Sequence, residues 1–260
     1  MSAASTMLAF ALLALSGWTS GALADEQFSE FAFRPHPGAH LPLASDFVDD
    51  QGSVALGRFF AGKPVVLVLD YLRCKTLCGL TLENLAAGLG ALPLDAGRDF
   101  QVVVISIDPR DKPADIAAAK AKYLGIYHHP AGDGGWHFLT GQQPVVERVA
   151  DVVGFPYRYE PALDQYIHPA GFVVAAPDGS ISRYLLGVNP QPTELEGALT
   201  DAMHGKTVGL VTRLLLLCHG DTPQLGRYSL AIEGAFVSAN LIAMIGGIAV
   251  FLAIRRRRHS

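Results

Sequence analysis

The chain has 260 residues, half of them hydrophobic, and a formal net charge of −4 at pH 7. This length suits one globular domain of ordinary size with additional segments at the ends. Removing the four arginines at 255–258 from the balance leaves −8 for the rest, so nucleic acid is a poor candidate partner.

The N-terminal segment has the features of a secretory signal. Residues 7–15, MLAFALLAL, form a short apolar stretch, and the ALA sequence at 22–24 fits the small-residue pattern that signal peptidase recognises. We therefore expect residues 1–24 to be a cleaved signal peptide and residues 25–40 to be an N-terminal extension of the mature chain. The rest of the protein would then be exported.

Two apolar strands, each followed by a helical pattern, open the central region at 41–205. After a hairpin-like insert at 47–56, the run VVLVLDY at 65–71 predicts a strand covered on both faces, and a leucine-rich helix follows it. FQVVVISID at 100–108 predicts a second buried strand, and an alanine-rich helix begins at Pro113. This alternation predicts parallel pairing with right-handed crossovers. The leucines expected on one face of the first helix are Leu77, Leu80, Leu82, Leu85 and Leu89.

The pattern changes in the second half of this region. A short strand is expected in GWHFLTG at 135–141, and an amphipathic helix at 143–154. Two apolar runs flank a Pro-Asp-Gly turn within residues 170–187 and predict a β-hairpin, and a last helix follows with Thr193 as its N-cap. The fold class is therefore a thioredoxin-like α/β fold, a mixed sheet with helices on both sides. The valines expected on the buried side of the amphipathic helix are Val145, Val149, Val152 and Val153.

The C-terminal segment has the features of a membrane anchor. GAFVSANLIAMIGGIAVFLAI at 234–254 is uncharged and long enough to cross a hydrocarbon core. RRRR follows at once, and short positive flanks face the cytoplasm. We expect a juxtamembrane linker at 206–231, a transmembrane helix at 232–254 and a basic cytoplasmic tail at 255–260. The chain would be a single-pass protein of the cell inner membrane with its globular domain on the periplasmic side.

The three cysteines, Cys74, Cys78 and Cys218, would lie in an oxidising compartment, where an odd count argues against a simple disulfide framework. Cys74 lies at the expected strand-to-helix turn and Cys78 one turn further, so both sulfurs share one helix face. Their Cβ atoms would be ~5–6 Å apart on a regular helix, whereas a disulfide needs ~3.5–4.5 Å. A metal ion between the sulfurs needs no such distortion.

The surroundings of Cys74 and Cys78 favour thiolates, because the helix N-terminus and the neighbouring Arg73 and Lys75 are positive. Two thiolates are soft ligands that prefer Cu(I) or Zn(II), and such sites commonly include an imidazole. We select His168 as that ligand, because it directly precedes the hairpin, in a loop that lies against the redox helix in a thioredoxin arrangement. The histidines expected to be surface or core residues are His36, His40, His128, His129, His137 and His204.

Cys218 and His219 follow an apolar run just before the predicted anchor. One interpretation is that Cys218 packs with this run on the domain or the bilayer surface, since a free cysteine behaves as a small hydrophobe. The alternative is a second, weaker copper-handling or redox site near the membrane, although an adjacent Cys-His pair cannot satisfy a metal alone. Both interpretations remain open.

Four segments carry a resemblance to a known family, namely FFAGKPVVLVLDYLRCKTLC, VVVISIDPRDKP, GWHFLTG and YIHPAGFVVAAPDGSISRYLLG. Together, over roughly residues 40–205, they resemble the SCO/SenC family of thioredoxin-fold copper chaperones of cytochrome c oxidase assembly. The resemblance implies that Cys74, Cys78 and His168 bind one copper ion, as Cu(I), with Cu(II) left open. It also implies that the recipient is the dinuclear copper site of cytochrome c oxidase subunit II, and it leaves the copper donor unidentified.

Other functions remain open at this point. The alternative function is a thiol-disulfide oxidoreductase acting on exported cysteine pairs, with Cys74 and Cys78 as its redox-active residues, although the usual redox spacing is the shorter CxxC. A peroxidase is less favoured, since Tyr71 and Leu67 occupy the positions where peroxidases of this fold have threonine and proline. A redox or copper sensor that binds a partner without delivering metal is a third class.

Overall fold

Runs of β-branched residues form a five-stranded mixed sheet in this computed structural model, which describes residues 30–73, 77–129, 132–207, 240 and 247. The strand order is β5-β4-β3-β8-β9, with β3, β4 and β5 parallel and β8 antiparallel to both of its neighbours. Every residue of β3 is buried, as expected for a strand covered on both faces. The strands are β3 (Val65–Asp70), β4 (Gln101–Ser106), β5 (Trp136–Leu139), β8 (Gly171–Ala175) and β9 (Ile181–Leu186).

The chain divides into two compact units, Met1–Asp221 and Thr222–Ser260, and the sheet belongs to the first. The predicted signal peptide, nearly all of the linker and anchor, and the basic tail lie outside the described residues. Cys218 and His219 lie outside them as well. In the part of the chain that the structure describes, no helix is both long and apolar enough to span a bilayer.

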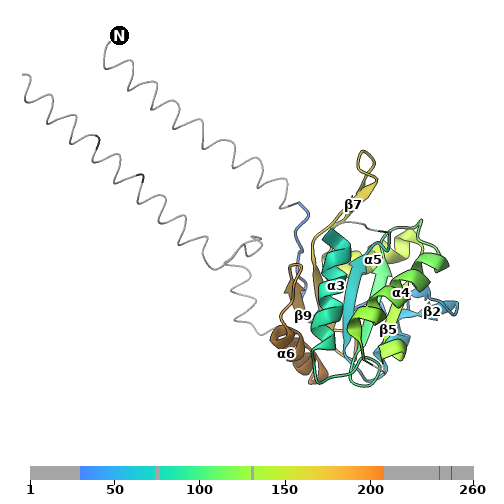
Figure 1. Cartoon of the computed structure of the whole chain (residues 1–260), viewed down its shortest axis with the longest axis vertical. Helices are drawn as coiled ribbons and strands as arrows, with labels where there is room; N and C mark the ends of the chain where they lie inside the picture. The colour runs from blue at the N-terminus through green and yellow to red at the C-terminus, as the bar shows by residue number, and fades with distance from the viewer. Residues whose placement is uncertain (1–29, 74–76, 130–131, 208–239, 241–246, 248–260) are drawn as a thin grey trace, which may run out of the picture. The chain divides into compact units, whose positions relative to one another are not determined.

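Alternate strand residues supply two hydrophobic cores, one on each face of the sheet. Val66 and Val68 of β3 pack in the core formed with α3, α4 and α6, whereas Leu67 and Leu69 pack in the core formed with α5 and the N-terminal segment. Figure 1 shows α3 and α4 in front of the sheet and α5 behind it. The predicted thioredoxin-like arrangement is confirmed. The helices are the 3₁₀ helix η1 (Leu56–Phe60), α3 (Leu77–Gly90), α4 (Pro113–Tyr127), the 3₁₀ helix η2 (Gly132–Gly134), α5 (Gln143–Val153) and α6 (Pro192–Met203).

The buried faces of α3 and α5 differ from the prediction in detail. Leu80 is 45% exposed, because it lies about 200° around α3 from the buried Leu82 at 100° per residue. In α5 the buried positions repeat with spacings of three and four residues, as one helix face requires. Two of the predicted core valines are therefore only partly buried, and two neighbours take their places. The buried residues of α5 are Val146, Val149, Ala150 and Val153, and the partly buried ones are Val145 and Val152.

The start of α6 also differs from the prediction. Gln191, not Thr193, is the N-cap, and Pro192 is the first helical residue, a position where its missing N–H costs nothing and its fixed φ suits the helix. Gln191 and Glu194 form a reciprocal capping box. The carboxylate of Glu194 thus accepts from the backbone N–H of Gln191 at 3.3 Å.

Two short hairpins lie outside the central sheet. The insert predicted at 47–56 forms the first, from β1 (Asp46–Val48) and β2 (Ser53–Ala55). The second, from β6 (Arg158–Glu160) and β7 (Gln165–Ile167), was not predicted, because its turn at 161–164 contains no glycine, unlike the turn of the first. In the described part of the chain β6 and β7 pair only with each other. Figure 1 shows this second hairpin projecting away from the helices.

Gly154 sets the direction in which the chain leaves α5 toward the second hairpin. It is the C-cap of α5 with a φ of 64°, in the left-handed region that favours glycine. Its carbonyl accepts the backbone N–H of Arg34 at 2.8 Å. An added Cβ would lie 1.8 Å from the carbonyl oxygen of Arg34, so only glycine allows this approach.

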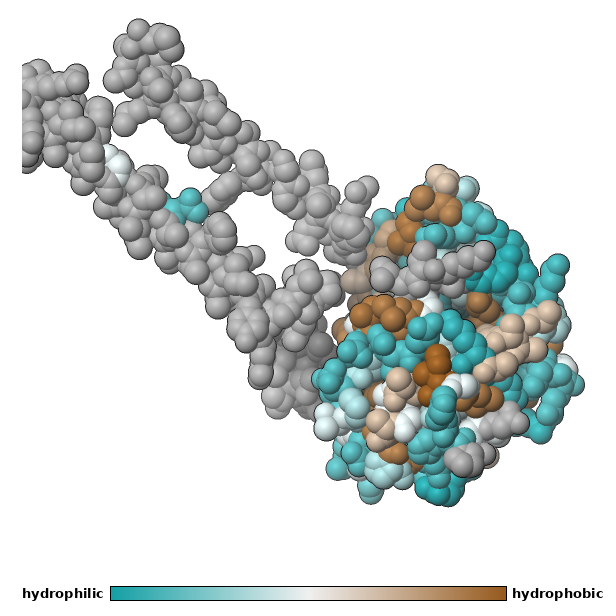
Figure 2. Space-filling model, in the orientation of Figure 1, coloured by the Kyte–Doolittle hydropathy of each residue, from teal (hydrophilic) through white to brown (hydrophobic). Residues whose placement is uncertain are grey.

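Large hydrophobic side chains are scattered over the described surface, which is mainly hydrophilic on the face that Figure 2 shows. Singly exposed residues of this kind are ordinary on soluble domains. Buried polar side chains are more informative, and several are aspartates near the carboxyl ends of β3 and β4. The exposed large hydrophobic residues are Val48, Leu80, Leu163, Leu186, Val188 and Met203.

Acid should destabilise the fold through His137 on β5. Burial, followed by the charge of Lys120, lowers the pKa of His137 from 6.5 to about 4. The unfolded chain therefore binds the proton first, and stability falls as the pH drops from about 6.5 toward 4. We expect the loss of unfolding free energy between pH 7.5 and 4.5 to be smaller in His137→Gln by up to about 2 kcal/mol, measured by urea denaturation. An equal loss in both proteins would contradict this assignment.

Candidate metal centre

The structure describes the backbone before and after Cys74. β3 ends at Asp70 and α3 begins at Leu77, so the predicted strand-to-helix turn lies between them. Cys74 is outside the described residues, and Cys78 is the second residue of α3 with its side chain also outside the described part. The structure therefore places the chain on either side of the CxxxC motif and leaves the sulfur positions as a prediction.

His168 lies beside the end of β3, close to where the cysteine segment begins. Its Nε2 is 3.8 Å from Oδ1 of Asp70, and its side chain is only 10% exposed. The ring stacks on Phe155 with a centroid distance of 5.5 Å and meets Tyr71 edge-on at 6.0 Å. Asp70 is four residues before Cys74, so the fold brings the predicted histidine next to the predicted cysteine segment.

A backbone hydrogen bond fixes the orientation of the His168 ring. Nδ1 lies 2.9 Å from the carbonyl oxygen of Pro169. A carbonyl can only accept, so Nδ1 carries the proton and donates it. In the neutral ring Nε2 then holds the lone pair, which is the arrangement found when a histidine binds a metal through Nε2.

Among the described side chains no three His, Cys, Asp or Glu residues gather closely enough to hold a metal ion by themselves. That set does not include the sulfurs of Cys74 and Cys78. A metal site at this position therefore depends on the cysteines, and the assignment of Cys74, Cys78 and His168 as ligands stays a prediction.

Asp111 anchors the residues that lead into the cysteine segment. Its buried carboxylate accepts the backbone N–H of Leu72 at 2.8 Å, Nε of Arg73 at 2.9 Å and the hydroxyl of Ser106 at 2.6 Å. Leu72 and Arg73 directly precede Cys74. The last described residues before Cys74 are thus tied to the loop that follows β4.

Asp108 binds two arginines at the same end of the sheet. It accepts from Arg73 at 2.8 Å, and the guanidinium of Arg110 contacts both of its carboxylate oxygens at 2.9 Å. Burial raises the pKa of Asp108, but the hydrogen bonds and charges of Arg110 and Arg73 outweigh it and hold the pKa below its usual range. A small cavity of about 220 Å³ opens here, and Tyr71, Arg73, Asp108, Arg110 and Asp164 line it.

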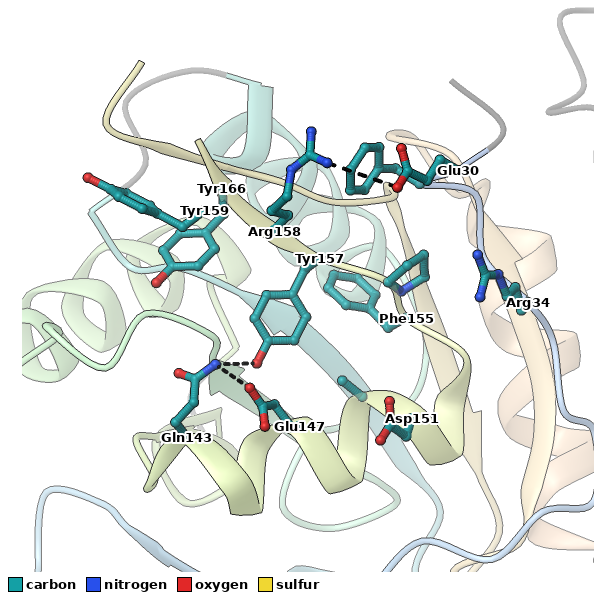
Figure 3. Close-up of a pocket in the computed structure, with 13 residues that line it drawn as sticks. Glu30, Arg34, Gln143, Glu147, Asp151, Phe155, Tyr157, Arg158, Tyr159 and Tyr166 are labelled. Atoms are coloured by element: carbon teal, nitrogen blue, oxygen red, sulfur yellow. Dashed lines mark hydrogen bonds and ion pairs between the residues drawn. The ribbon is translucent and has the colours of Figure 1, made fainter. Parts of the chain in front are cut away.

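A larger cavity of about 620 Å³ lies against α5 and the second hairpin, where Figure 3 shows its aromatic lining. The hydroxyl of Tyr157 contacts Nε2 of Gln143 at 3.1 Å, and burial raises the pKa of Tyr157 to about 12. Phe155, which stacks on the His168 ring, also lines this cavity. Its described lining contains neither cysteine nor histidine, so it offers no soft ligand for copper.

The other described histidines contact groups of the domain itself. His129 pairs with Asp95 at 2.6 Å and with the carbonyl of Gly90 at 2.9 Å. His137 lies 2.9 Å from Oε1 of Gln101. The remaining four cap a helix or contact backbone in other ways, namely His36, His40, His128 and His204.

The sequence reasoning missed the polar network that supports the cysteine segment. Asp108, Arg110 and Asp111 lie in the SIDPRDKP segment, from which the sequence analysis predicts a strand end, a helix start and a family resemblance but no polar network. A signal was available, because three charged residues directly after a buried parallel strand lie at the sheet edge where sites form. Their partner Asp164 in the second hairpin carries no such signal.

A model of the SCO1/SenC family matches residues 38–204. The chain belongs to the SCO1/SenC family. Membership agrees with the segments that carried the resemblance and with the fold. It also places the described strands and helices from β1 to α6 within one family domain.

Individual relatives are distant. A candidate copper-binding protein of Stutzerimonas stutzeri is 26% identical over 156 residues, covering 58% of this chain and 70% of the relative. A SCO1 protein homologue of Bacillus subtilis strain 168 is 25% identical over 165 residues, covering 62% and 75%. The crystal structure of a candidate electron transfer protein from Aquifex aeolicus VF5 is similar at 27% identity and a TM-score of 0.58, covering 66% and 96%.

Removing the Asp111 carboxylate should destabilise the domain. Asp111→Ala would leave the Leu72 amide and Nε of Arg73 without this acceptor and the buried Ser106 hydroxyl with only the longer contact to the Asp108 carbonyl at 3.3 Å, so we expect a loss of about 3 kcal/mol of unfolding free energy. Chemical denaturation measures this loss. The control is Asp46→Ala on β1, where the side chain is exposed and the expected change is below about 0.5 kcal/mol. Similar losses in the two variants would contradict the anchoring role.

Proposed function

We propose that this protein is a membrane-anchored copper chaperone. In this proposal Cys74, Cys78 and His168 bind one Cu(I) ion, and the protein delivers it to the dinuclear copper site of cytochrome c oxidase subunit II. A helix at 232–254 would anchor the chain in the cell inner membrane, with the copper-binding domain in the periplasm. The family membership and the copper-binding description of the Stutzerimonas relative support copper as the metal.

One observation carries the proposal, the position of His168 beside the end of β3. The histidine is almost a hundred residues from the cysteines in sequence, yet its Nε2 lies 3.8 Å from Asp70 at the start of the turn that contains Cys74. The hydrogen bond from Nδ1 to Pro169 gives the ring the orientation and tautomer of an Nε2 ligand. A histidine with only a packing role would not need this placement.

The chemistry of the neighbouring groups suits a soft monovalent ion. Thiolate and imidazole are ligands that Cu(I) prefers, whereas carboxylates prefer hard cations. The carboxylates of Asp108 and Asp111 are held by arginine and backbone donors, and Oδ1 of Asp70, the carboxylate oxygen beside His168, accepts the backbone N–H of Tyr71 at 2.7 Å. These groups would therefore compete only weakly for the ion. Stepwise exchange of ligands with thiolates of the recipient would then transfer the ion without any net redox change.

Replacing His168 should weaken copper binding. We expect His168→Ala to lower the Cu(I) affinity of the reduced full-length chain at least about 100-fold, since even changes to groups behind a ligand often cost 10–100-fold. Competition with a chromophoric Cu(I) chelator measures the affinity. The matched control is His40→Ala, an exposed histidine away from the site, which should leave the affinity unchanged.

The same pair of variants separates the chaperone from a thiol-disulfide oxidoreductase. That enzyme needs only the cysteine pair, so it would retain insulin disulfide reduction in His168→Ala and would need no copper. Undiminished Cu(I) affinity in His168→Ala would remove this histidine from the site and with it the proposed chaperone.

Delivery itself requires a transfer experiment. The copper-loaded full-length chain, purified in detergent, should pass its ion to an apo form of the oxidase subunit II domain. We expect copper to co-elute with the recipient after separation, in the amount that the chain loses, because ligand exchange moves the whole ion from one protein to the other. Retention of copper on the loaded wild-type chain would argue against delivery to this recipient.

A further inference from the structure

His168 lies between the second hairpin, which is outside the central sheet, and β8, which is part of it. On one side, β8 begins three residues after His168 and pairs with β3. On the other side, His168 directly follows β7, and within the described chain β7 pairs only with β6. The sheet therefore places the chain after His168, whereas side-chain contacts must hold the hairpin before it.

Arg110 provides such a contact from the loop after β4. Its terminal Nη1 donates to Oδ1 of Asp164 at 2.8 Å and lies 3.3 Å from the hydroxyl of Tyr159. The hydroxyl of Tyr159 donates to the same oxygen of Asp164 at 2.6 Å. The guanidinium also stacks over the Tyr159 ring, 4.7 Å from its centroid. Asp164 directly precedes β7, and His168 directly follows it, so this cluster holds the hairpin at the start of the strand that leads to His168.

The same guanidinium is held from the other side by Asp108. Nε and Nη2 of Arg110 each lie 2.9 Å from a different oxygen of the Asp108 carboxylate. The same carboxylate also accepts Nη2 of Arg73 at 2.8 Å. Arg73 is the residue before Cys74. A continuous chain of charge-assisted contacts therefore runs from the cysteine segment through Asp108 and Arg110 to the hairpin.

The planar fork of arginine suits this double role. Two of its nitrogens face Asp108, and the third faces Asp164. Lysine would carry the same charge on a single nitrogen and could not span both carboxylates. The backbone of Asp164 adopts a φ of 49°, in the left-handed region, directly before β7.

We infer that Arg110 is a positioning residue for the proposed copper site. Through Asp164 and Tyr159 it holds the second hairpin, which leads into His168, at a fixed distance from the cysteine segment. This inference rests on the proposed function for its copper readout. Within the described residues, the Arg110 guanidinium contacts Asp108, Asp164 and Tyr159 rather than the His168 ring. It acts on the ion through the placement of His168, and this indirect action gives a specific test.

The test measures Cu(I) affinity of the reduced full-length chain in a double-mutant cycle. We expect Arg110→Ala and Asp164→Asn each to weaken binding about tenfold, and the double variant to weaken it no further, because both changes break one link. In a His168→Ala background, Arg110→Ala should have no effect on the remaining affinity. Arg110→Lys should bind Cu(I) almost as weakly as Arg110→Ala, because lysine lacks the planar guanidinium that spans both carboxylates.

Two controls separate positioning from a general loss of structure. The Asp164 side chain is 74% exposed, so Asp164→Asn should leave the thermal unfolding midpoint unchanged. Arg98→Ala removes an arginine that is also ion-paired, with Asp95 and Asp99, at the opposite end of β4, and it should leave Cu(I) affinity unchanged. In the metal-free protein, amide hydrogen exchange at 165–167 should speed up in Arg110→Ala and not in Arg98→Ala.

The outcomes distinguish this inference from the proposed function. If His168→Ala weakens Cu(I) binding but Arg110→Ala and Asp164→Asn do not, the positioning role is wrong and the copper site stands. The positioning role is equally wrong if Arg110→Ala causes an equal loss in the His168→Ala background, or if hydrogen exchange at 165–167 is unchanged. If the wild-type chain binds no Cu(I), or His168→Ala binds it undiminished, the proposed function itself fails.

Discussion

The structure depends on the pairing of two buried carboxylates at the carboxyl end of the central sheet. Asp108 and Asp111 are almost fully shielded from water, and an isolated charge in such a place is strongly unfavourable. Each is therefore surrounded by donors, from Arg73, Arg110, Ser106 and backbone N–H groups. These groups come from the end of β4, from the loop after it and from the residues before Cys74. The hydrogen bonds to the two carboxylates therefore also hold Leu72 and Arg73, which directly precede Cys74, in place.

This constraint explains how a site can form between segments that the sheet does not join. Parallel pairing of β3 with β4 puts Asp70 opposite Ser106, which brings the starts of two different loops together. The hairpin of β6 and β7 has no ladder to this edge in the described chain. It is held by aromatic contacts, among them Tyr71 with Tyr166 at 5.5 Å, and by Arg110. The position of His168 therefore results from two constraints, the pairing of β8 with β3 just after it in the chain and the side-chain contacts of the hairpin before it.

The sequence predicted the parts of the fold that periodicity determines. Buried β-branched runs indicated β3 and β4, and the Pro-Asp-Gly turn indicated β8 and β9, because these signals are local. The hairpin of β6 and β7 was missed, since three-residue strands with partly exposed tyrosines have no distinct period. The proximity of His168 to Asp70 was anticipated only by analogy with the thioredoxin arrangement. Its fixed tautomer depends on the backbone at Pro169, which no residue pattern specifies.

The charge arrangement also bears on how the proposed site could both hold and release an ion. Two thiolates side by side would repel each other and the carboxylates nearby, and a monovalent cation would cancel only one of their two charges. Arg73, which directly precedes Cys74, is shared by Asp108 and Asp111, so a net negative charge would remain at the loaded site. The imidazole packs against the core residues Phe155 and Tyr71, so its departure from the ion would disturb that packing. Stepwise exchange with a second protein would therefore start at the proposed sulfur ligands rather than at the imidazole.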